Sequence, residues 1–389
     1  MTLQQSRLPK ASLLADPGLR RPRRRPSWMW TLVVLGLGLG ALELALRGLG
    51  LGHPPLFVAD RQMEYRFRPN QTLRRFGHPI QINQWGMRST PLSPRPTPGK
   101  RRLLVLGDSI TWGGAVTDQD RIAISRLQRQ LGPSWEVANL ATPSWGPANW
   151  LGAVRRFGLL GARQVLLVMS THDALDDPTY DSLEGNPETP SQDPPLALIE
   201  LWQRYLLPRL RQHWPPAGGG PADPMNPSVT SATAPARDDK VLEPRALGSV
   251  LAPGSDSRRP FDTLMRRTRK DPRHPNRPLD LLLPLPALDA LIDAVEGRGA
   301  QLVVLQFWER GEVESGRPWP DHNRITALLQ RRGVPITQAG PILRQCATAH
   351  GQPIAALYVD PIHPYTDLGQ RCLAVALQRA LRPLAGRSS

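Results

Sequence analysis

Two short motifs contain side chains that could act together in nucleophilic chemistry. The first is GDS at positions 107–109, which directly follows an apolar run, and the second is DPIHP at 360–364, which follows another. A serine hydroxyl is a weak nucleophile until a base takes its proton. A carboxylate three residues before an imidazole can orient that base and stabilise its protonated form. The two motifs therefore indicate a Ser–His–Asp arrangement of Ser109, His363 and Asp360.

Each motif on its own has a simpler explanation. Asp and Ser both favour helix N-caps, so GDS also fits an ordinary turn from a strand into a helix. The second motif also fits a capping Asp360 beside a surface His363. The chemical interpretation requires a fold that brings the hydroxyl of Ser109 within hydrogen-bonding reach of the His363 imidazole, across ~250 intervening positions.

The elements that must position these motifs alternate between strands and helices. Short apolar runs bounded by turn residues predict buried strands at 103–106, 135–140, 164–170, 301–307 and 355–359. Helical periodicity predicts helices at 122–131, 147–160, 287–296, 321–332 and 367–381. This alternation predicts a three-layer α/β/α sandwich around a parallel sheet, of flavodoxin-like type. Enzymes with such sheets bind ligands at the carboxyl ends of the strands, where both motifs are expected.

An apolar segment near the N-terminus predicts one transmembrane helix before this domain. The run WMWTLVVLGLGLGAL at 28–42 is uncharged, and apolar residues resume after Glu43, which gives the ~20 residues that a bilayer crossing needs. RRPRRRP precedes it, so the positive-inside rule predicts a cytoplasmic tail at 1–27 and an anchor at 28–50. A cleaved signal peptide is the alternative, but no convincing cleavage site precedes Asp60. We therefore expect a single-pass inner-membrane protein whose main domain is periplasmic.

Composition divides the rest of the chain. Residues 51–100 are polar and rich in proline, and are expected to be a linker and lead-in to a domain at 101–389. Within that domain, 178–280 contains PPAGGGPADPMNPSVTSATAPARDD and is predicted to be a largely disordered insertion. Inside it, Leu196–Trp214 keeps apolar residues at helical spacing, with a kink expected at Pro208.

Charge and cysteine content limit the partners and cofactors. The formal charge of +16 is spread along the chain without a zinc-finger, RNP or helix-turn-helix pattern, so no nucleic-acid partner is expected. Cys346 and Cys372 lack metal-ligand spacing, so we expect no zinc site and no other cofactor. They form either a disulfide or two buried free thiols. Asp173, Asp176 and Asp177 are interpreted as solvated loop acids, with no metal assigned.

With these motifs in place, the chain resembles the SGNH hydrolases, also called GDSL esterases, from about Ile82 to Leu381. The blocks INQWGMR (82–88), LLVLGDSITWGGAV (103–116), WEVANL (135–140) and VDPIHPYTDLGQRCLAVAL (359–377) look like the membrane-tethered bacterial branch. The resemblance implies that Ser109 is the nucleophile, His363 the base and Asp360 its orienting acid. It also implies an oxyanion hole made by Ser109 and by two further positions, which are Ser144 and His172 here.

Those last two positions depart from the family pattern, which has glycine at the first and asparagine at the second. Ser144 keeps a backbone N–H, whereas the imidazole of His172 differs from an amide in reach and tautomer. Losing one oxyanion donor typically lowers the rate about 10²- to 10³-fold.

The resemblance implies an extracytoplasmic esterase or O-acyltransferase that acts on acyl, in particular acetyl, esters of cell-envelope or exported polysaccharide. The alternative is a catalytically weakened domain that binds glycan or a partner protein. The acyl acceptor and the oligomeric state stay open.

Overall fold

The fold is seen in a computed structural model, which describes residues 27–213 and 281–385. The chain divides into two compact units, Met1–Ala45 and Leu46–Ser389. Helix α1 runs from Ser27 to Gly48. Its residues Trp28–Gly48 include a window with a mean hydropathy of 1.9 and are long and apolar enough to cross a membrane, a test that a signal sequence also passes.

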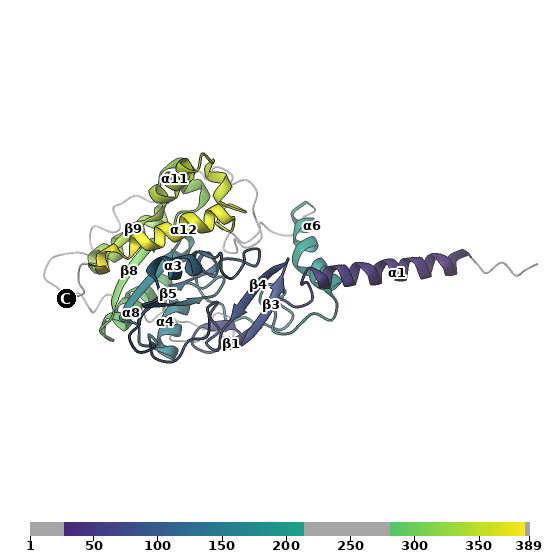
Figure 1. Ribbon diagram of the computed structural model, residues 1–389, viewed down its shortest axis with the longest axis horizontal. Helices are drawn as coiled ribbons and strands as arrows, with labels where there is room; N and C mark the ends of the chain where they lie inside the picture. Colours follow the sequence, from purple (N-terminus) through teal and green to yellow (C-terminus); the bar gives the residue numbers. More distant parts are fainter. Residues whose placement is uncertain (1–26, 214–280, 386–389) are drawn as a thin grey trace, which may run out of the picture. The chain divides into compact units, whose positions relative to one another are not determined.

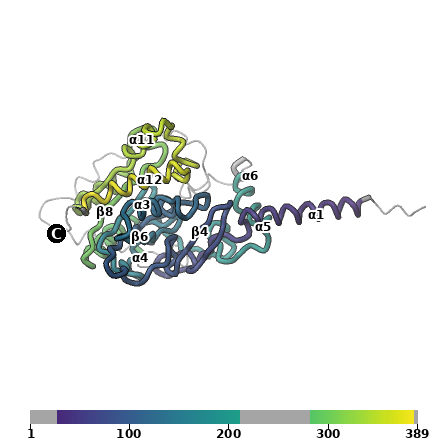
Figure 2. The backbone as a smooth tube through the Cα atoms, in the orientation of Figure 1, coloured from purple at the N-terminus to yellow at the C-terminus, as the bar shows by residue number. Residues whose placement is uncertain are grey.

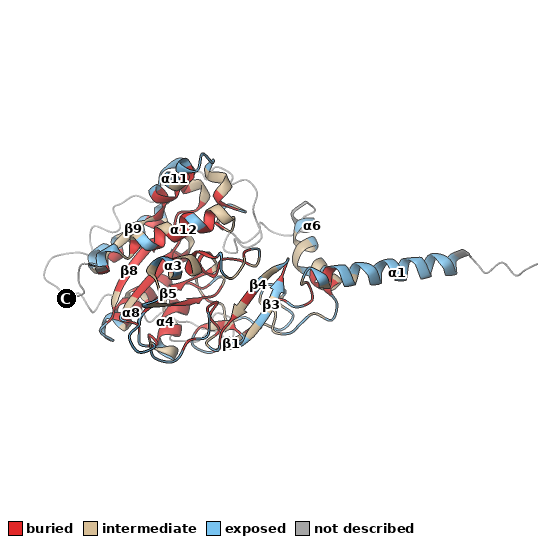
Figure 3. Cartoon of the chain, viewed as in Figure 1, coloured by how far each residue is buried: buried red, intermediate tan, exposed pale blue. Residues whose placement is uncertain are grey.

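A five-stranded parallel sheet forms the centre of the larger unit, in the order β6-β5-β7-β8-β9 (Figure 1). Its strands are β5 (Arg101–Gly107), β6 (Trp135–Ala141), β7 (Gln164–Met169), β8 (Gln301–Gln306) and β9 (Ile336–Gln338). The middle strands are buried along almost their whole length, as the strands of a parallel sheet covered on both faces must be (Figure 3). The parallel α/β architecture expected from the alternating pattern is therefore confirmed.

Successive side chains of a strand point to opposite faces of the sheet, and here both sets are apolar. Helices therefore cover both faces. Leu104 and Leu106 of β5 belong to one core, while Leu103 and Val105 belong to the other. The first core packs against α4 (Pro147–Phe157), α8 (Pro284–Glu296) and α10 (Pro320–Arg331). The second packs against α3 (Ala123–Leu131), α11 (Ala339–Ala349) and α12 (Asp367–Ala380).

The two ends of the domain meet in the second layer. Helices α3 and α12 lie side by side although more than half of the chain separates them (Figure 2). The side chain of Gln370 accepts a hydrogen bond from the backbone N–H of Ala123 at 2.7 Å. This contact brings the C-terminal motif next to the segment that follows the serine motif.

Residues 51–100 are not a linker. They form two antiparallel hairpins, β1 (Phe57–Asp60) with β2 (Glu64–Phe67) and β3 (Gln71–Arg75) with β4 (His78–Ile82). Their apolar side chains belong to the same core as α4 and α8. The expectation that folding begins near Arg101 is corrected here, because strands of four or five residues are too short to show a clear periodicity among prolines and charges.

The fifth strand of the sheet is not the one expected. Ile354–Leu357 forms a short 3₁₀ turn, η4, whereas the edge strand is the three-residue β9. The apolar residues at 355–359 were expected to join the sheet, but Leu357 and Tyr358 are buried instead in the helical layer around α12. A buried apolar run therefore did not distinguish strand from turn.

The part of the predicted insertion that the structure describes is ordered as a loop followed by a helical run. The run consists of α5 (Ala197–Glu200), a π-helical turn η2 (Leu201–Leu206) and α6 (Leu207–His213). The widened turn lies just before Pro208, whose ring would otherwise clash with the carbonyl four residues earlier. Residues 214–280, for which disorder was expected, lie outside the described residues.

The two cysteines form a disulfide rather than staying free. Cys346 of α11 and Cys372 of α12 are bonded, with their Cα atoms 5.7 Å apart. The bond links two helices of the second layer and fixes the helix that follows the DPIHP motif.

Candidate active site

Ser109 lies on a tight turn at the carboxyl end of β5. Strand β5 ends at Gly107, and Ser109 is the first residue of the short helix α2 (Ser109–Trp112). Asp108 caps this helix, because its Oδ1 accepts the N–H of Ile110 at 2.8 Å. Position 107 must be glycine, since a Cβ there would lie 2.4 Å from Oγ1 of Thr111. The turn therefore holds the serine hydroxyl at the edge of the sheet where ligands of such folds bind.

The DPIHP motif forms a compact turn that orients His363. Oδ1 of Asp360 accepts the backbone N–H groups of Ile362 and His363, both at 2.8 Å. The other oxygen, Oδ2, lies 2.7 Å from Nδ1 of His363. Burial by itself raises the pKa of Asp360, but its hydrogen bonds with His363 outweigh this and lower the pKa below the ordinary value. The carboxylate is thus charged and fixes Nδ1 as the protonated ring nitrogen.

The fold brings the two motifs into direct contact. Nε2 of His363 lies 3.0 Å from Oγ of Ser109, across 254 positions of sequence. With Nδ1 directed at Asp360, Nε2 is the nitrogen available to accept the serine proton. Ser109, His363 and Asp360 therefore lie in the order that nucleophilic catalysis needs.

Tyr365 supports this arrangement and was not singled out from the sequence. Its hydroxyl donates a hydrogen bond to the carbonyl oxygen of Ser109 at 2.7 Å, and its ring stacks on the imidazole of His363 with centroids 4.7 Å apart. Gly114 makes room for the ring, because a Cβ at that position would lie 2.5 Å from it. The available signal was an aromatic residue two positions after the histidine.

Arg88, which follows the second hairpin, fixes the loop after the helix that begins at Ser109. Its guanidinium is buried and donates hydrogen bonds to the carbonyl oxygens of Trp112 at 2.9 Å and Thr117 at 2.6 Å. These bonds fix the loop that contains Gly114. Residues before Arg101 thus help to position the site.

Ser144 lies in the loop between β6 and α4, at the same edge of the sheet. It is exposed, and its φ of +59° places it in the left-handed region that favours glycine. The glycine of the family pattern fits this backbone conformation, and the serine adopts it here as well. The backbone at Ser144 therefore has the conformation that a glycine at this position would adopt, and it keeps a backbone N–H.

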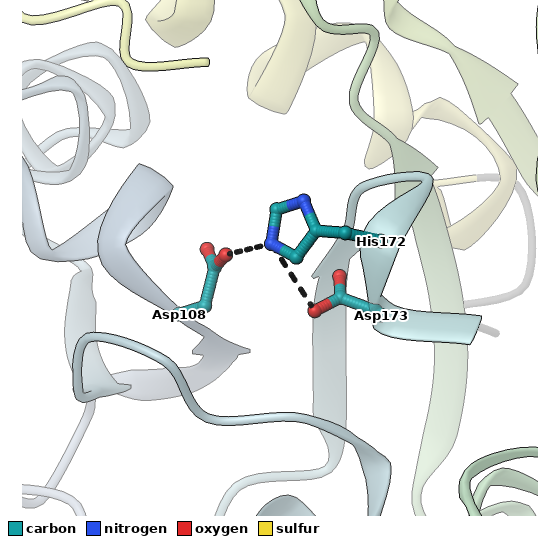
Figure 4. A group of neighbouring side chains, drawn as sticks. All are labelled: Asp108, His172 and Asp173. Carbon is teal, nitrogen blue, oxygen red and sulfur yellow. Dashed lines mark ion pairs between the residues drawn. The ribbon is translucent and has the colours of Figure 1, made fainter. Parts of the chain in front are cut away.

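His172 follows β7 in the short turn η1 (His172–Ala174) and faces carboxylates with both ring nitrogens. Nδ1 lies 3.0 Å from Oε1 of Glu309, and Nε2 lies 3.4 Å from Oδ2 of Asp108 (Figure 4). Burial by itself lowers the pKa of His172, but the interactions with the carboxylates of Asp108 and Glu309 outweigh it and raise the pKa well above the ordinary value. The side chain at this position is thus an imidazolium rather than a neutral amide.

Asp173 is not a solvated loop acid, which corrects the interpretation made from the sequence. It is fully buried, Oδ2 accepts the N–H of Ser170 at 2.6 Å, and burial raises its pKa well above the ordinary value. Asp176 is also largely enclosed, and burial raises its pKa to about 6. Both carboxylates lie 3.9 Å from Nε2 of His172.

A metal ion is the other group that such a cluster could hold. Donor atoms of Asp108, His172 and Asp173 lie within 4.8 Å of one another, and one oxygen of each carboxylate is buried without a hydrogen bond. A metal ligand must be a neutral imidazole, however, whereas these carboxylates raise the pKa of His172. With a proton in place of a metal ion, the imidazolium of His172 supplies the positive charge of this cluster.

A second buried network fixes the end of β7 from behind. Oγ1 of Thr171 donates to Oε1 of Glu312 at 2.8 Å and lies 3.0 Å from Nδ1 of His322. Glu312 also accepts the N–H of Glu309 at 2.9 Å, which caps α9 (Arg310–Ser315). Sequence analysis missed Glu309, although an acid directly after a predicted strand is the same signal that marked Asp360.

One cavity of the larger unit lies outside the Ser109 and His363 site. A cavity of about 570 Å³ is lined by Trp308, Gly316 and residues of α11, and it does not include Ser109 or His363.

No protein-family model matches the chain, and no curated protein does. Among solved structures, the chain is similar to a member of the lipolytic G-D-S-L family from Veillonella parvula, with 10% identity, a TM-score of 0.36, and coverage of 72% of this chain and 97% of that one. It is similar to an acetylxylan esterase from Geobacillus stearothermophilus, with 13% identity, a TM-score of 0.37, and coverage of 73% and 95%. An aryl esterase of M. smegmatis gives 14% identity, a TM-score of 0.31, and coverage of 73% and 99%.

At these identities and TM-scores, the similarity does not indicate an activity. The activity is inferred from the geometry of the chain itself. The chain is similar to a G-D-S-L family protein and to two esterases, and its own parallel sheet brings Ser109, His363 and Asp360 together.

Proposed function

We propose that this protein is a serine esterase or O-acyltransferase in which Ser109 is the nucleophile, His363 the general base and Asp360 the acid that orients it. One observation carries the proposal: Oγ of Ser109 lies 3.0 Å from Nε2 of His363, whose Nδ1 lies 2.7 Å from Asp360. This geometry serves acyl transfer, because the base can take the serine proton as the new bond forms.

The reaction proceeds in two halves. Oγ of Ser109 attacks the acyl carbonyl carbon while Nε2 of His363 takes the hydroxyl proton. The bond between the acyl carbon and the alcohol oxygen then breaks, and the imidazolium gives its proton to the departing alkoxide, which leaves as an alcohol. The acyl group stays on Oγ of Ser109 as an acyl-serine. In the second half His363 takes a proton from water or from a sugar hydroxyl, whose oxygen attacks the acyl carbon. The bond to Oγ of Ser109 then breaks, His363 returns the proton to Oγ, and the acyl group leaves as a free acid or as a sugar ester. Hydrolysis or transfer depends on which acceptor reaches the site.

The tetrahedral intermediate needs donors aimed at its oxyanion. The backbone N–H of Ser109 lies at the start of α2, and we assign the second donor to the N–H of Ser144. His172, the third position, adds positive charge beside Asp108. Because both of its ring nitrogens face carboxylates, its contribution is the potential of an imidazolium rather than that of a free amide donor.

The test is hydrolysis of p-nitrophenyl acetate by the full-length protein in detergent. Ser109→Ala should lower kcat by roughly 10⁴-fold or more, because the nucleophile is removed. Ser134→Ala is the matched control, since that serine is exposed and lies away from the site. Equal rates for the wild type and Ser109→Ala would instead support the alternative, a weakened domain that binds glycan or a partner.

We also propose that α1 is an uncleaved anchor and that the larger unit lies in the periplasm. The length and apolar character of α1 support the anchor, and the basic run before it supports this orientation. The Cys346–Cys372 disulfide supports an oxidising compartment. A phosphatase fused after Gly52 should be active only when exported, whereas activity of a cytoplasm-only reporter there would reverse the orientation.

For the substrate, we propose acetyl esters of cell-envelope or exported polysaccharide, as the sequence resemblance implies. Release of acetate from acetylated polysaccharide by the wild type, but not by Ser109→Ala, would support it. Activity on p-nitrophenyl acetate without any release from polysaccharides would restrict the proposal to small esters.

A further inference from the structure

The helical run 197–213 is fixed to the last turn of the apolar helix α1 and to the residues that follow it. The last turn of α1, from Leu46, belongs to the larger unit. Leu46 and Leu51 form a small core with Ala197 of α5. The side chain of Arg47 donates a hydrogen bond to the carbonyl oxygen of Pro195 at 3.1 Å.

Buried charges strengthen this attachment. Glu200 forms an ion pair with Arg75, and their side chains are only 5% and 1% exposed. Oε2 of Glu200 also accepts the backbone N–H of Gly52 at 2.6 Å, and Arg75 donates to the hydroxyl of Tyr205 at 3.0 Å. Removing either charge would leave the other buried without its partner, so the helical run has a defined position on this segment.

The same run exposes an apolar face. Trp202, Leu206 and Leu210 are 48%, 39% and 52% exposed. They are spaced four residues apart, which places them on one side of a helix, and in Figure 3 part of α6 is coloured as exposed. No described residue outside the helical run is packed against them in a hydrophobic cluster.

Beyond Glu200, which is paired with Arg75, the charged side chains of the run are all basic. The sequence LWQRYLLPRLRQH at 201–213 contains three arginines and no acidic residue. A helix that exposes Trp and Leu together with a basic side chain such as Arg209 fits the interface of a bilayer, where the apolar side enters the acyl region and the basic side chain meets anionic headgroups. Long Arg side chains can reach from such a helix to the headgroups.

We propose that the run 197–213 is an interfacial helix that lies on the same membrane that α1 crosses, with lipid as the occupant of the Trp202, Leu206 and Leu210 face. This proposal rests on the proposed anchoring by α1. Ala197 packs with Leu46, in the last turn of α1, so the run begins close to the residues at which the chain leaves the bilayer if α1 spans it. The catalytic unit is then held by two membrane contacts, which limits its rotation about α1.

The experiment uses the full-length protein in vesicles of phosphatidylcholine and phosphatidylglycerol. Both native cysteines are paired, so one introduced cysteine can be labelled with an environment-sensitive fluorophore. The test site is Leu206→Cys, with Leu37→Cys in α1 as the anchor control and the exposed Asn323→Cys of α10 as the aqueous control. Quenching is measured with lipids spin-labelled near the headgroup and with iodide in the buffer.

We expect the probe at 206 to be quenched by shallow spin-labelled lipid about threefold more than the probe at 323, and to be protected from iodide. Replacing phosphatidylglycerol by phosphatidylcholine should reduce this quenching, because the arginines lose their anionic partners. Lipid quenching at 37 together with iodide access at 206 would overturn the interfacial helix while keeping the anchor. Protection from iodide at 206 without lipid quenching would show that protein covers the face. No lipid quenching at 37 would remove the anchor and this proposal together.

Discussion

Two histidines at the carboxyl edge of the sheet have the same side chain and opposite surroundings. His363 has one carboxylate, Asp360, on Nδ1 and the hydroxyl of Ser109 on Nε2. His172 has carboxylates on both nitrogens, and four lie within 3.9 Å of it. At His363 one acid orients the ring and leaves its second nitrogen available to Ser109, whereas at His172 the surrounding acids raise the pKa of the imidazole and favour its charged form. The number of carboxylates around the ring therefore separates a proton carrier from a fixed charge.

The largest expected effect tests the proton carrier. His363→Ala should lower kcat for p-nitrophenyl acetate by roughly 10⁶-fold, because Ser109 loses its base. His350→Ala is the matched control, since His350 is exposed and directly follows α11. Steady-state kinetics measures both variants. A loss smaller than about tenfold for His363→Ala would show that His363 is not the base.

The next effect tests the single carboxylate beside it. Asp360→Asn should lower kcat by about 10⁴-fold, because an amide can favour the wrong tautomer of His363. Burial raises the pKa of Asp360, but its bonds with His363 lower it below the ordinary value of 3.8. Its stabilising contribution is therefore present above pH ~4 and lost as the pH falls through the lower folded value.

Urea unfolding of the wild type and Asp360→Asn across this range checks that sign. The advantage of the wild type should shrink on acidification. A constant difference between the two proteins from pH 7 to well below pH ~4 would contradict it.

His172→Asn tests the fixed charge by restoring the amide of the family pattern. Removing the cation from a group of buried carboxylates should lower the free energy of unfolding by about 3 kcal/mol at pH 7. The loss in kcat should stay within about 10²- to 10³-fold, far below that of His363→Ala. Thermal unfolding and kinetics measure the two effects separately. Unchanged stability with a loss of kcat as large as that of His363→Ala would reverse the roles of the two histidines.

Asp176→Asn gives a smaller effect of known sign. Burial raises the pKa of Asp176 to about 6, so the folded state binds its proton more tightly than the unfolded state. The charged carboxylate therefore destabilises the fold as the pH rises from ~4 through ~6, and no penalty exists below this window. The variant should be more stable than the wild type by about 1–2 kcal/mol at pH 7 and equal to it near pH 4. Asp120→Asn, an exposed aspartate, is the control and should show no such trend.

The smallest expected effect concerns metals. Because the neighbouring carboxylates raise the pKa of His172 and favour its charged form, we expect the imidazolium to take the place of a metal cation, and treatment with EDTA should leave kcat and the unfolding temperature unchanged. Loss of activity on chelation, restored by a divalent cation, would show that His172 is neutral and ligates a metal.

The predictable parts of the fold were those with a long, regular signal. Strands β5, β7 and β8 are unbroken apolar runs, and each was expected within two residues of its observed bounds. The hairpins β1–β4 and the edge strand β9 have three to five residues each, too few to show a period. They form because their apolar side chains find a core contributed by distant residues, which local propensity does not report.

The same division applies to the site. Ser109, Asp360 and His363 lie in short motifs at predictable strand or turn ends, so their types and positions were visible. Tyr365 and Glu309 were missed, because their roles depend on which side chain lies opposite them in space. The burial of Asp173 was also invisible, since an acid in a loop has the same sequence signature whether or not a helix covers it.

The sequence by itself determined the alternating elements and the apolar N-terminal helix, and it singled out Ser109, Asp360 and His363 as candidate site residues, because these follow from local periodicity and from chemistry at fixed spacing. Only the tertiary structure decided that Ser109 and His363 meet at 3.0 Å, that Cys346 pairs with Cys372, and that His172 is enclosed by carboxylates. Each of these is a distance between residues on different elements. The packing of side chains between layers sets such distances, and no local pattern encodes them.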